Sequence, residues 1–365
     1  METQKLSDIC EYRKEKTLVS KLTIKNYVST ENLLPNKEGL INASSLPAID
    51  TTQAYFKSDV LVSNIRPYFK KIWMADNNGG CSNDVLVFKA KEEVNPEFLY
   101  YVLSNDKFFD YSMALSKGTK MPRGDKSAIM NYSVPKISII EQRKIGSLLK
   151  GIDEKIKINK SINRNLFEQV ATLFKSWFVD FDRNNGLCPE DWKIITLGEI
   201  ANICSGKRPP MKQENKTNET CIPLVGATSV MGYTNSTLYD SKILVTGRVG
   251  THGIVQRFNK ECWPSDNTLV ITTKWYEFVN QILLNIDYDS MNRGSTQPLI
   301  TQSDLKKTEI ILPTCNILDE FESCASGLMK QFEKNNEENR KLAELRDSLL
   351  PKLMSGELDV SNLEI

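Results

Sequence analysis

Hydrophobic and polar positions follow two patterns along this chain. In residues 138–182 and again in 313–365, apolar side chains recur at alternating intervals of four and three, and residues 152–174 contain no proline or glycine. A repeat of this kind, sustained over several heptads, predicts a long coiled-coil helix. The first helix would be roughly 57 Å long from Glu141 to Phe178, at about 1.5 Å per residue.

The two helical segments are copies of each other. An offset of 176 residues brings Asn335 onto Asn159 and Asn339 onto Asn163, and nine of the ten compared seam positions keep their character. The exception is Arg346, which falls on an apolar position of the first copy. Two matched asparagines in two apolar seams indicate an internal repeat.

The second pattern occupies the region before each helical segment. Short β-branched and aromatic runs alternate there with turn residues, and "VLVSNIRP" (60–67) resembles "ILVTGRVG" (243–250). Such runs predict short strands, and helical stretches lie among them. We therefore expect a mixed α/β domain over 1–137, a helix over 138–182, a second domain over 183–312 and a helix over 313–365.

This order predicts an α+β protein in which two mixed α/β domains, related by a pseudo-twofold, are joined by two long antiparallel helices. Asn159 should then face Asn339, and Asn163 should face Asn335, because the matched asparagines lie at the helix midpoints. Buried amide pairs penalise slipped registers, so these four residues are expected to set the register. The other possibility is a solvated waist with the amides turned outward. The second copy ends where the first begins, so the two termini should lie close together.

Composition narrows the functional classes only slightly. The 365 residues have 40% hydrophobic content and a net charge of +1, typical of a globular protein that could still carry a local basic face. No apolar run reaches the length that a bilayer needs, and no signal peptide begins the chain, so a cytoplasmic protein is expected. The eight cysteines form no C-x-x-C pair and predict neither a disulfide framework nor a metal site.

Three segments resemble a known family, the specificity (S) subunits of type I restriction-modification systems. They are "EQRKIGSLLKGIDEKIKINKSINRNLFEQVATLFKSWFVDFD" (141–182), "NRKLAELRDSLLPKLMSGEL" (339–358) and "CPEDWKIITLGEIANICSGKRP" (188–209). The first opens with the family's usual E-Q-[RK] signature at Glu141, Gln142 and Arg143. The second helix opens without this Gln, which leaves its contact with a second partner subunit open.

The resemblance implies that each α/β domain is a target recognition domain that reads one half of a bipartite, asymmetric DNA sequence. It also implies two methyltransferase (M) subunits bound around the helices and restriction (R) subunits in the full complex. The family's S subunit is not catalytic, so S-adenosylmethionine, ATP and Mg are expected only on partner subunits.

The residues agree with a non-catalytic role. The chain has no N/D-P-P-Y/F motif, no Walker A loop and no GxGxxG, and we assign no catalytic or metal-binding residue. His252 is the only histidine, and we interpret it as a turn residue. Two rival functions are a symmetric coiled-coil protein scaffold without DNA recognition, and a single-chain DNA-modifying enzyme, which the missing motifs disfavour.

Basic and small polar residues on loops of the two domains are the candidates for DNA contact. They are Arg66, Lys70, Lys71, Lys117, Lys120, Arg123, Lys126, Lys207, Arg208, Lys212, Arg248, Arg293 and Gln297. The helix ends carry more apolar bulk than a two-stranded seam uses. Candidates there for partner binding, with internal packing as the alternative, are Phe167, Phe174, Trp177, Phe178, Leu349, Leu350 and Leu353.

Overall fold

The computed structural model describes residues 2–118, 120–249, 253–291 and 299–360. The chain divides into two compact units: unit 1 is Met1–Asn159 with Glu337–Ile365, and unit 2 is Lys160–Asn336. Each unit therefore holds one α/β domain together with part of each long helix. In the part of the chain that is described, no helix is long and apolar enough to cross a membrane.

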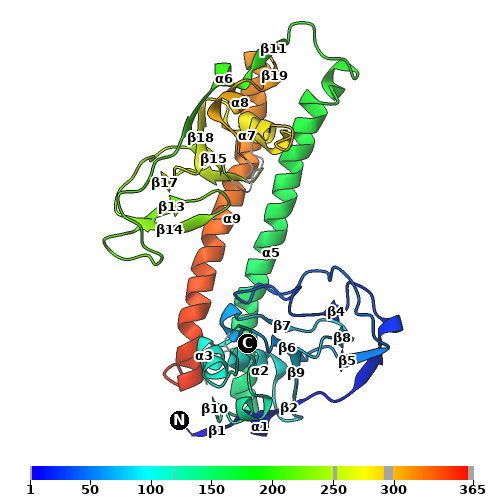
Figure 1. Ribbon diagram of the computed structural model, residues 1–365. Helices are drawn as coiled ribbons and strands as arrows, with labels where there is room; N and C mark the ends of the chain where they lie inside the picture. Colours follow the sequence, from blue (N-terminus) through cyan, green and yellow to red (C-terminus); the bar gives the residue numbers. More distant parts are fainter. Residues whose placement is uncertain (1, 119, 250–252, 292–298, 361–365) are drawn as a thin grey trace. The chain divides into compact units, whose positions relative to one another are not determined.

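Among the described residues, the domain of unit 1 has three sheets. Figure 1 labels most of their strands. Their strand orders are β2-β9-β6-β7, β3-β5-β8-β4 and β1-β10. The strands are β1 (Thr3–Lys5), β2 (Cys10–Tyr12), β3 (Lys16–Leu18), β4 (Tyr27–Val28), β5 (Thr51–Tyr55), β6 (Val60–Ser63), β7 (Ile72–Met74), β8 (Gly79–Cys81), β9 (Val85–Ala90) and β10 (Ser133–Pro135). The helices are α1 (Leu6–Ile9), η1 (Val19–Lys21), η2 (Pro67–Phe69), α2 (Pro96–Ser104), α3 (Asp106–Ala114) and α4 (Lys126–Ile129).

In the described part of unit 2 the domain also has three sheets, with the strand orders β12-β18-β15-β16, β14-β13-β17 and β11-β19. The strands are β11 (Lys193–Thr196), β12 (Ala201–Ser205), β13 (Ile222–Val225), β14 (Val230–Thr234), β15 (Ile243–Gly247), β16 (Val255–Phe258), β17 (Trp263–Pro264), β18 (Thr268–Thr273) and β19 (Glu309–Leu312). The helices are η3 (Asp182–Asn184), α6 (Leu197–Ile200), α7 (Tyr276–Asn285) and α8 (Gln302–Lys306).

The predicted repeat is confirmed by the topology inside each unit. The sheet β2-β9-β6-β7 is antiparallel throughout, and so is its counterpart β12-β18-β15-β16. The smaller sheets differ, because β8 joins β5 to β4 in unit 1 whereas β13 joins β14 to β17 in unit 2. The two domains thus share one sheet and diverge in the other.

The predicted long helices are α5 (Ile139–Phe178) and α9 (Cys315–Ser355). In unit 1, Asp153 pairs with Arg346 and Asn159 with Asn339, so rising numbers on α5 meet falling numbers on α9. In unit 2 the contacts of Asn163 with Asn335 and Asn336 belong to the same antiparallel pattern. The expected fold class, two mixed α/β domains with long antiparallel helices, is confirmed in this form.

Both amide layers are present. Asn159 donates to Asn339 at 3.0 Å within unit 1, and Asn335 donates to Asn163 at 2.8 Å within unit 2. Asn159, Asn163 and Asn335 are buried and Asn339 is half-buried, so the amides do not turn outward as the alternative supposed. Their effect on register stays a prediction.

The apolar bulk at the helix ends packs inside the units. In unit 2, Phe174 and Phe178 are buried against Phe278 and Phe321, with ring centroids 5.1–6.1 Å apart. The same packing includes Phe167 and Trp177, which are partly buried. In unit 1 the core contains Leu350 and Leu353, and Leu349 packs against it. All seven candidates for partner binding therefore contribute to internal packing, which was the stated alternative. The apolar surface that they bury explains why each helix end attaches to a domain.

The predicted closeness of the termini concerns Met1 and Ile365, which lie outside the described residues. The described residues nearest to both ends belong to unit 1, where Val360 packs in the same core as Leu6.

Candidate nucleic-acid interface

The sequence "RPYFKK" forms a strained turn in unit 1. Arg66 and Lys70, which flank the short helix η2, both adopt the left-handed conformation, with φ of 51°. A non-glycine residue in this region costs roughly 1–3 kcal/mol, and such strain clusters at functional sites. Three bonds from other segments hold the turn: Arg66 N to Pro122 O at 2.9 Å, Asn36 N to Phe69 O at 2.8 Å and Lys37 N to Lys70 O at 3.0 Å.

Two of the candidate lysines in this turn are engaged inside unit 1. Lys70 lies 2.8 Å from Asp106, which also binds Lys37 at 2.7 Å. Lys71 donates from Nζ to the carbonyl of Thr30 at 2.6 Å. Burial lowers the pKa of Lys71. Lys70 and Lys71 therefore stabilise the turn, and their ammonium groups already have partners within unit 1.

Arg66 is the candidate of this turn whose charge is available. Its side chain is half-buried, and Nε is buried without a hydrogen-bond partner in the described part of unit 1. Beside it, Oδ1 of the buried Asn64 also lacks a partner. Gly124 packs there, since a Cβ on it would lie 2.8 Å from that oxygen. Unpaired buried polar atoms cost free energy, so these two atoms add to the strain of the turn.

The loop over residues 117–126 lies beside this turn. Ile65 bridges to Arg123, and Lys117 and Arg123 exchange two backbone bonds of 2.9 and 3.0 Å. Arg123 is 3.0 Å from Asp84, and Lys117 is 3.5 Å from Asp125. The loop's further candidates, Lys120 and Lys126, are exposed. The structure thus brings Arg66 beside the 117–126 loop, which has four basic residues and one acidic residue, and it pairs two of these basic residues with Asp84 and Asp125.

In unit 2 the candidates gather around the segment between β17 and β18. Lys207 N donates to Pro264 O at 3.0 Å, and Trp263 Nε1 donates to Lys207 O at 2.8 Å. Arg248 N donates to Asn267 O at 2.9 Å, and its Nε, like that of Arg66, is buried without a hydrogen-bond partner among described residues. Gly206 permits the approach, because a Cβ there would lie 2.2 Å from Ser265 O.

The remaining candidates of unit 2 are less defined. Arg208 and Lys212 are exposed on the long loop that follows β12. Arg293 and Gln297 lie outside the described residues, as does His252.

The strongest feature that the candidate set missed is aromatic. Tyr68 and Phe69, at the tip of the same turn, are 50% and 37% exposed, with ring centroids 4.6 Å apart. The available signal was the pattern itself, since two aromatic residues stand between one arginine and two lysines. Basic groups with exposed aromatic rings are the elements that single-stranded or unstacked nucleic acid requires.

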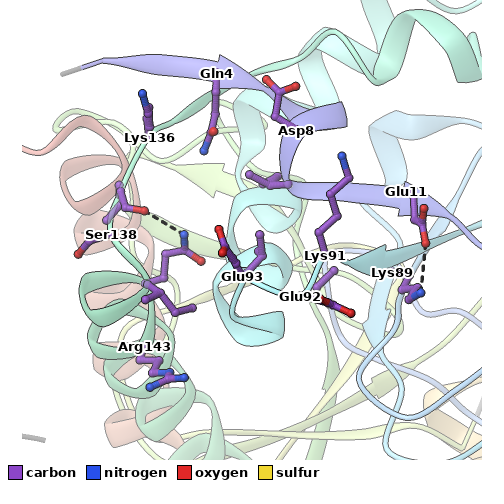
Figure 2. A pocket seen from close by; sticks show the side chains of 16 residues that line it. Gln4, Asp8, Glu11, Lys89, Lys91, Glu92, Glu93, Lys136, Ser138 and Arg143 are labelled. Carbon is purple, nitrogen blue, oxygen red and sulfur yellow. Dashed lines mark hydrogen bonds and ion pairs between the residues drawn. The ribbon is translucent and has the colours of Figure 1, made fainter.

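A large hollow lies elsewhere in unit 1 and has about 1,130 Å³ (Figure 2). Figure 2 shows Lys136, Ser138 and Arg143 on one side and Glu11 paired with Lys89 on another. Acidic and basic groups alternate around it, so the lining favours no single ligand charge.

Gln142, at the same hollow, is an internal cross-link. Its Oε1 accepts from Asn95 N at 3.0 Å, and its Nε2 donates to Ile137 O at 2.9 Å. The Gln142 side chain is only 4% exposed, so it is not available to a partner subunit. The second helix has no glutamine at this position and therefore lacks these two internal bonds.

Comparison with known proteins gives a consistent result. The chain matches the family of type I restriction modification DNA specificity domains over residues 1–167 and 189–346. It is 25% identical to the type I restriction enzyme MjaIX specificity subunit of Methanocaldococcus jannaschii, covering 75% of this chain and 71% of that one. It is 23% identical to the HindI specificity subunit of Haemophilus influenzae, covering 91% and 94%.

A solved structure shares the fold. The crystal structure of the type I restriction-modification S subunit from M. genitalium is similar with a TM-score of 0.64 and 18% identity, covering 97% of this chain and 96% of that one. The repeated domain topology and the two family matches, which together span most of the sequence, lead to one conclusion: this chain belongs to the type I restriction-modification DNA specificity family.

Proposed function

We propose that this chain gives a type I restriction-modification complex its DNA sequence specificity, each α/β domain reading one half of a bipartite, asymmetric target. The observation that carries the proposal is the pairing of a shared sheet with divergent loops. Both domains have the same four-stranded antiparallel sheet, whereas the smaller sheets and the residues after β6 and β15 differ. A common scaffold with different loops suits two different half-sites.

The electrostatics of the loops support contact with a phosphate backbone. In each unit an arginine whose buried Nε has no hydrogen-bond partner among the described residues follows an interior strand of the shared sheet, namely Arg66 and Arg248. Arginine suits bidentate contact with phosphate or with the O6 and N7 of guanine. Exposed lysines on neighbouring loops would add the salt-dependent part of the affinity.

The helices α5 and α9 would set the spacing between the half-sites and bind two M subunits, and R subunits would join in the full complex. The chain itself would contribute no catalytic group. S-adenosylmethionine, ATP and Mg would bind to the partners, and the complex would work on DNA in the cytoplasm. Because the seven apolar residues at the helix ends are packed internally, M subunits would contact other side chains of the helices.

Methylation mapping tests this function directly. A host expressing the chain with its M subunits should carry methylated adenines at one bipartite sequence, and the same host without the chain should lack them. Replacing residues 1–137 with the corresponding domain of a relative should change one half of that sequence and leave the other intact. Methylation that does not depend on the chain would overturn the proposal. A chain that assembles M subunits without any sequence-dependent DNA binding would favour the scaffold.

A further inference from the structure

We infer that Tyr68 is the tip of an aromatic wedge that stacks on a base of the target duplex, and that this device is built into unit 1 only. The inference rests on the proposed function and specifies how one half of the target is engaged. Tyr68 is an exposed tyrosine in a strained turn that also carries Arg66, Lys70 and Lys71.

The backbone on both sides of Tyr68 is anchored. Pro67 is buried, so the turn is anchored directly before the tip, and Phe69 packs beside the tyrosine with the Lys71 ammonium 5.8 Å from its centroid. Half of the Tyr68 surface nevertheless stays in solvent. A ring on an anchored backbone costs less conformational freedom on stacking than one on a free loop.

Ion pairs and backbone bonds maintain the strain. Asp106, the first residue of α3, binds the ammonium groups of Lys37 and Lys70 at 2.7 and 2.8 Å. Lys37 and Asn36 also have positive φ, of 64° and 55°, and both donate backbone bonds to the turn. Two strained loops are thus locked against each other, which is unnecessary for a passive surface turn.

Charge selects the occupant. Arg66 directly precedes the η2 turn and its backbone bonds to Pro122, and Lys120 and Lys126 of the adjacent 117–126 loop are exposed, whereas Lys117 and Arg123 are paired with Asp125 and Asp84. An apolar protein surface would gain nothing from this charge, whereas a nucleic acid offers phosphates to the cations and bases to the ring. Duplex DNA that exposes an unstacked base fits both parts of the surface.

The sequence after β15 contains no counterpart of Tyr68. After β15 the sequence continues "RVGTHG" (248–253), which has no Phe, Tyr or Trp, although Arg248 is present. The arginine is therefore common to both units, and the wedge is specific to the first. We expect base unstacking in one half-site only.

Photo-cross-linking in the complex of this chain with its M subunits provides the test. The duplex carries the target found by methylation mapping, with 5-iododeoxyuridine replacing each thymine in turn. We expect a cross-link to Tyr68, located by mass spectrometry, at one position of one half-site. Tyr68→Ala should weaken binding roughly 10- to 100-fold, as loss of one stacked base does, whereas Tyr68→Trp should retain it.

Salt dependence separates stacking from phosphate contact. Tyr68→Ala should leave the slope of log affinity against log salt unchanged, whereas Arg66→Ala should reduce it by about one. Phe56→Ala is the matched control, because Phe56 is an exposed aromatic residue of the same unit, 38% exposed, outside the turn.

Three results would overturn the inference. They are wild-type affinity of Tyr68→Ala without any cross-link to residues 66–71, an equal loss in Phe56→Ala, and a loss of M-subunit assembly in Tyr68→Ala without DNA. The last would identify the tip as a protein contact. Failure of the proposed function is distinct, because no chain-dependent methylation would then exist in the wild type.

Discussion

Arg346 donates from Nη1 to Asp153 Oδ1 at 2.7 Å, where α9 runs beside α5 in unit 1. The internal repeat places Val170 and Met329 at the equivalent positions, and both are buried in the core of unit 2. One copy therefore uses a charged pair where the other uses an apolar pair. The arginine that broke the seam pattern is explained by a partner on the other helix.

This relationship predicts the behaviour of a double-mutant cycle. Arg346→Val should lower the free energy of unfolding of unit 1 by about 1–3 kcal/mol, because Asp153 keeps a poorly solvated charge without its partner. Adding Asp153→Met, with Tyr101→Phe to remove the hydroxyl that donates to this carboxylate, should restore most of the loss. Urea denaturation measures both steps. Lys155→Met, which breaks an exposed 3.5 Å pair with Glu338, should cost well under about 1 kcal/mol.

The amide layers predict a trade between stability and register. Asn163→Leu should cost about 1–3 kcal/mol, since it leaves the buried amide of Asn335 without its 2.8 Å partner. The double variant Asn163→Leu, Asn335→Leu should recover stability but permit other pairings. Thermal unfolding with analytical ultracentrifugation would show a stable but heterogeneous protein. A homogeneous monomer in the double variant would contradict a role in register.

Two glycines of α5 allow matched substitutions whose expected effects on stability are opposite. A Cβ on Gly146 would lie 2.7 Å from Asn95 Oδ1, the oxygen that caps α2 through Phe98 N. Gly146→Ala should therefore destabilise unit 1, by about 1–2 kcal/mol through the damaged cap. A Cβ on Gly151 meets nothing within 4 Å, so Gly151→Ala should stabilise by about 0.5–1 kcal/mol. Melting temperatures of the two variants should shift in opposite directions.

The internal repeat places Glu322 of the second helix at the position of Gly146 in the first. This residue predicts a pH dependence for the stability of unit 2. Glu322 Oε1 accepts from Phe278 N at 2.8 Å and so caps α7, which lacks a side-chain cap of its own. Burial raises the pKa of Glu322 above its ordinary value of 4.5, although the amides of Phe278 and Glu277 act against this. The contribution of this group to stability is thus complete below pH 4.5 and is lost as the pH rises through the folded-state pKa.

The variant Glu322→Gln removes that titration. Its melting temperature relative to the wild type should rise between about pH 4.5 and neutrality, because the wild type alone acquires a buried charge. Glu320→Gln, which changes an exposed carboxylate two residues earlier, should follow the wild-type pH profile. Parallel profiles for wild type and Glu322→Gln would show that the raised pKa has no effect on stability.

Arg66 and Arg248 should act on separate half-sites. Each change to Ala should lower the salt slope of DNA binding by about one, because one cation fewer displaces counterions from the phosphates. Binding assays on duplexes altered in one half-site at a time would show Arg66→Ala relaxing one half and Arg248→Ala the other. Lys70→Met, in which the lost charge is already paired with Asp106, should change the slope less. Equal effects on both halves would argue against one domain per half-site.

Some of this protein could be predicted from local patterns. The 3-4 spacing predicted α5 and α9, and the matched asparagines predicted which layers would meet, because a helix places every third or fourth residue on one face. The alternating β-branched runs predicted mixed domains with a repeated plan. These features depend on residues close together in the chain, or on a copy elsewhere in it.

The tertiary structure alone decided which candidate side chains are available. Lys70 and Lys71 look like Arg66 in the sequence, but Asp106 and Thr30, far away in the chain, engage the first two and not the third. The aromatic residues at the end of α5 were candidates for partner binding, but in the structure they pack in the core of unit 2. Periodicity encodes secondary structure because its contacts are local, whereas the use of a charge or an apolar ring depends on partners that only folding brings together.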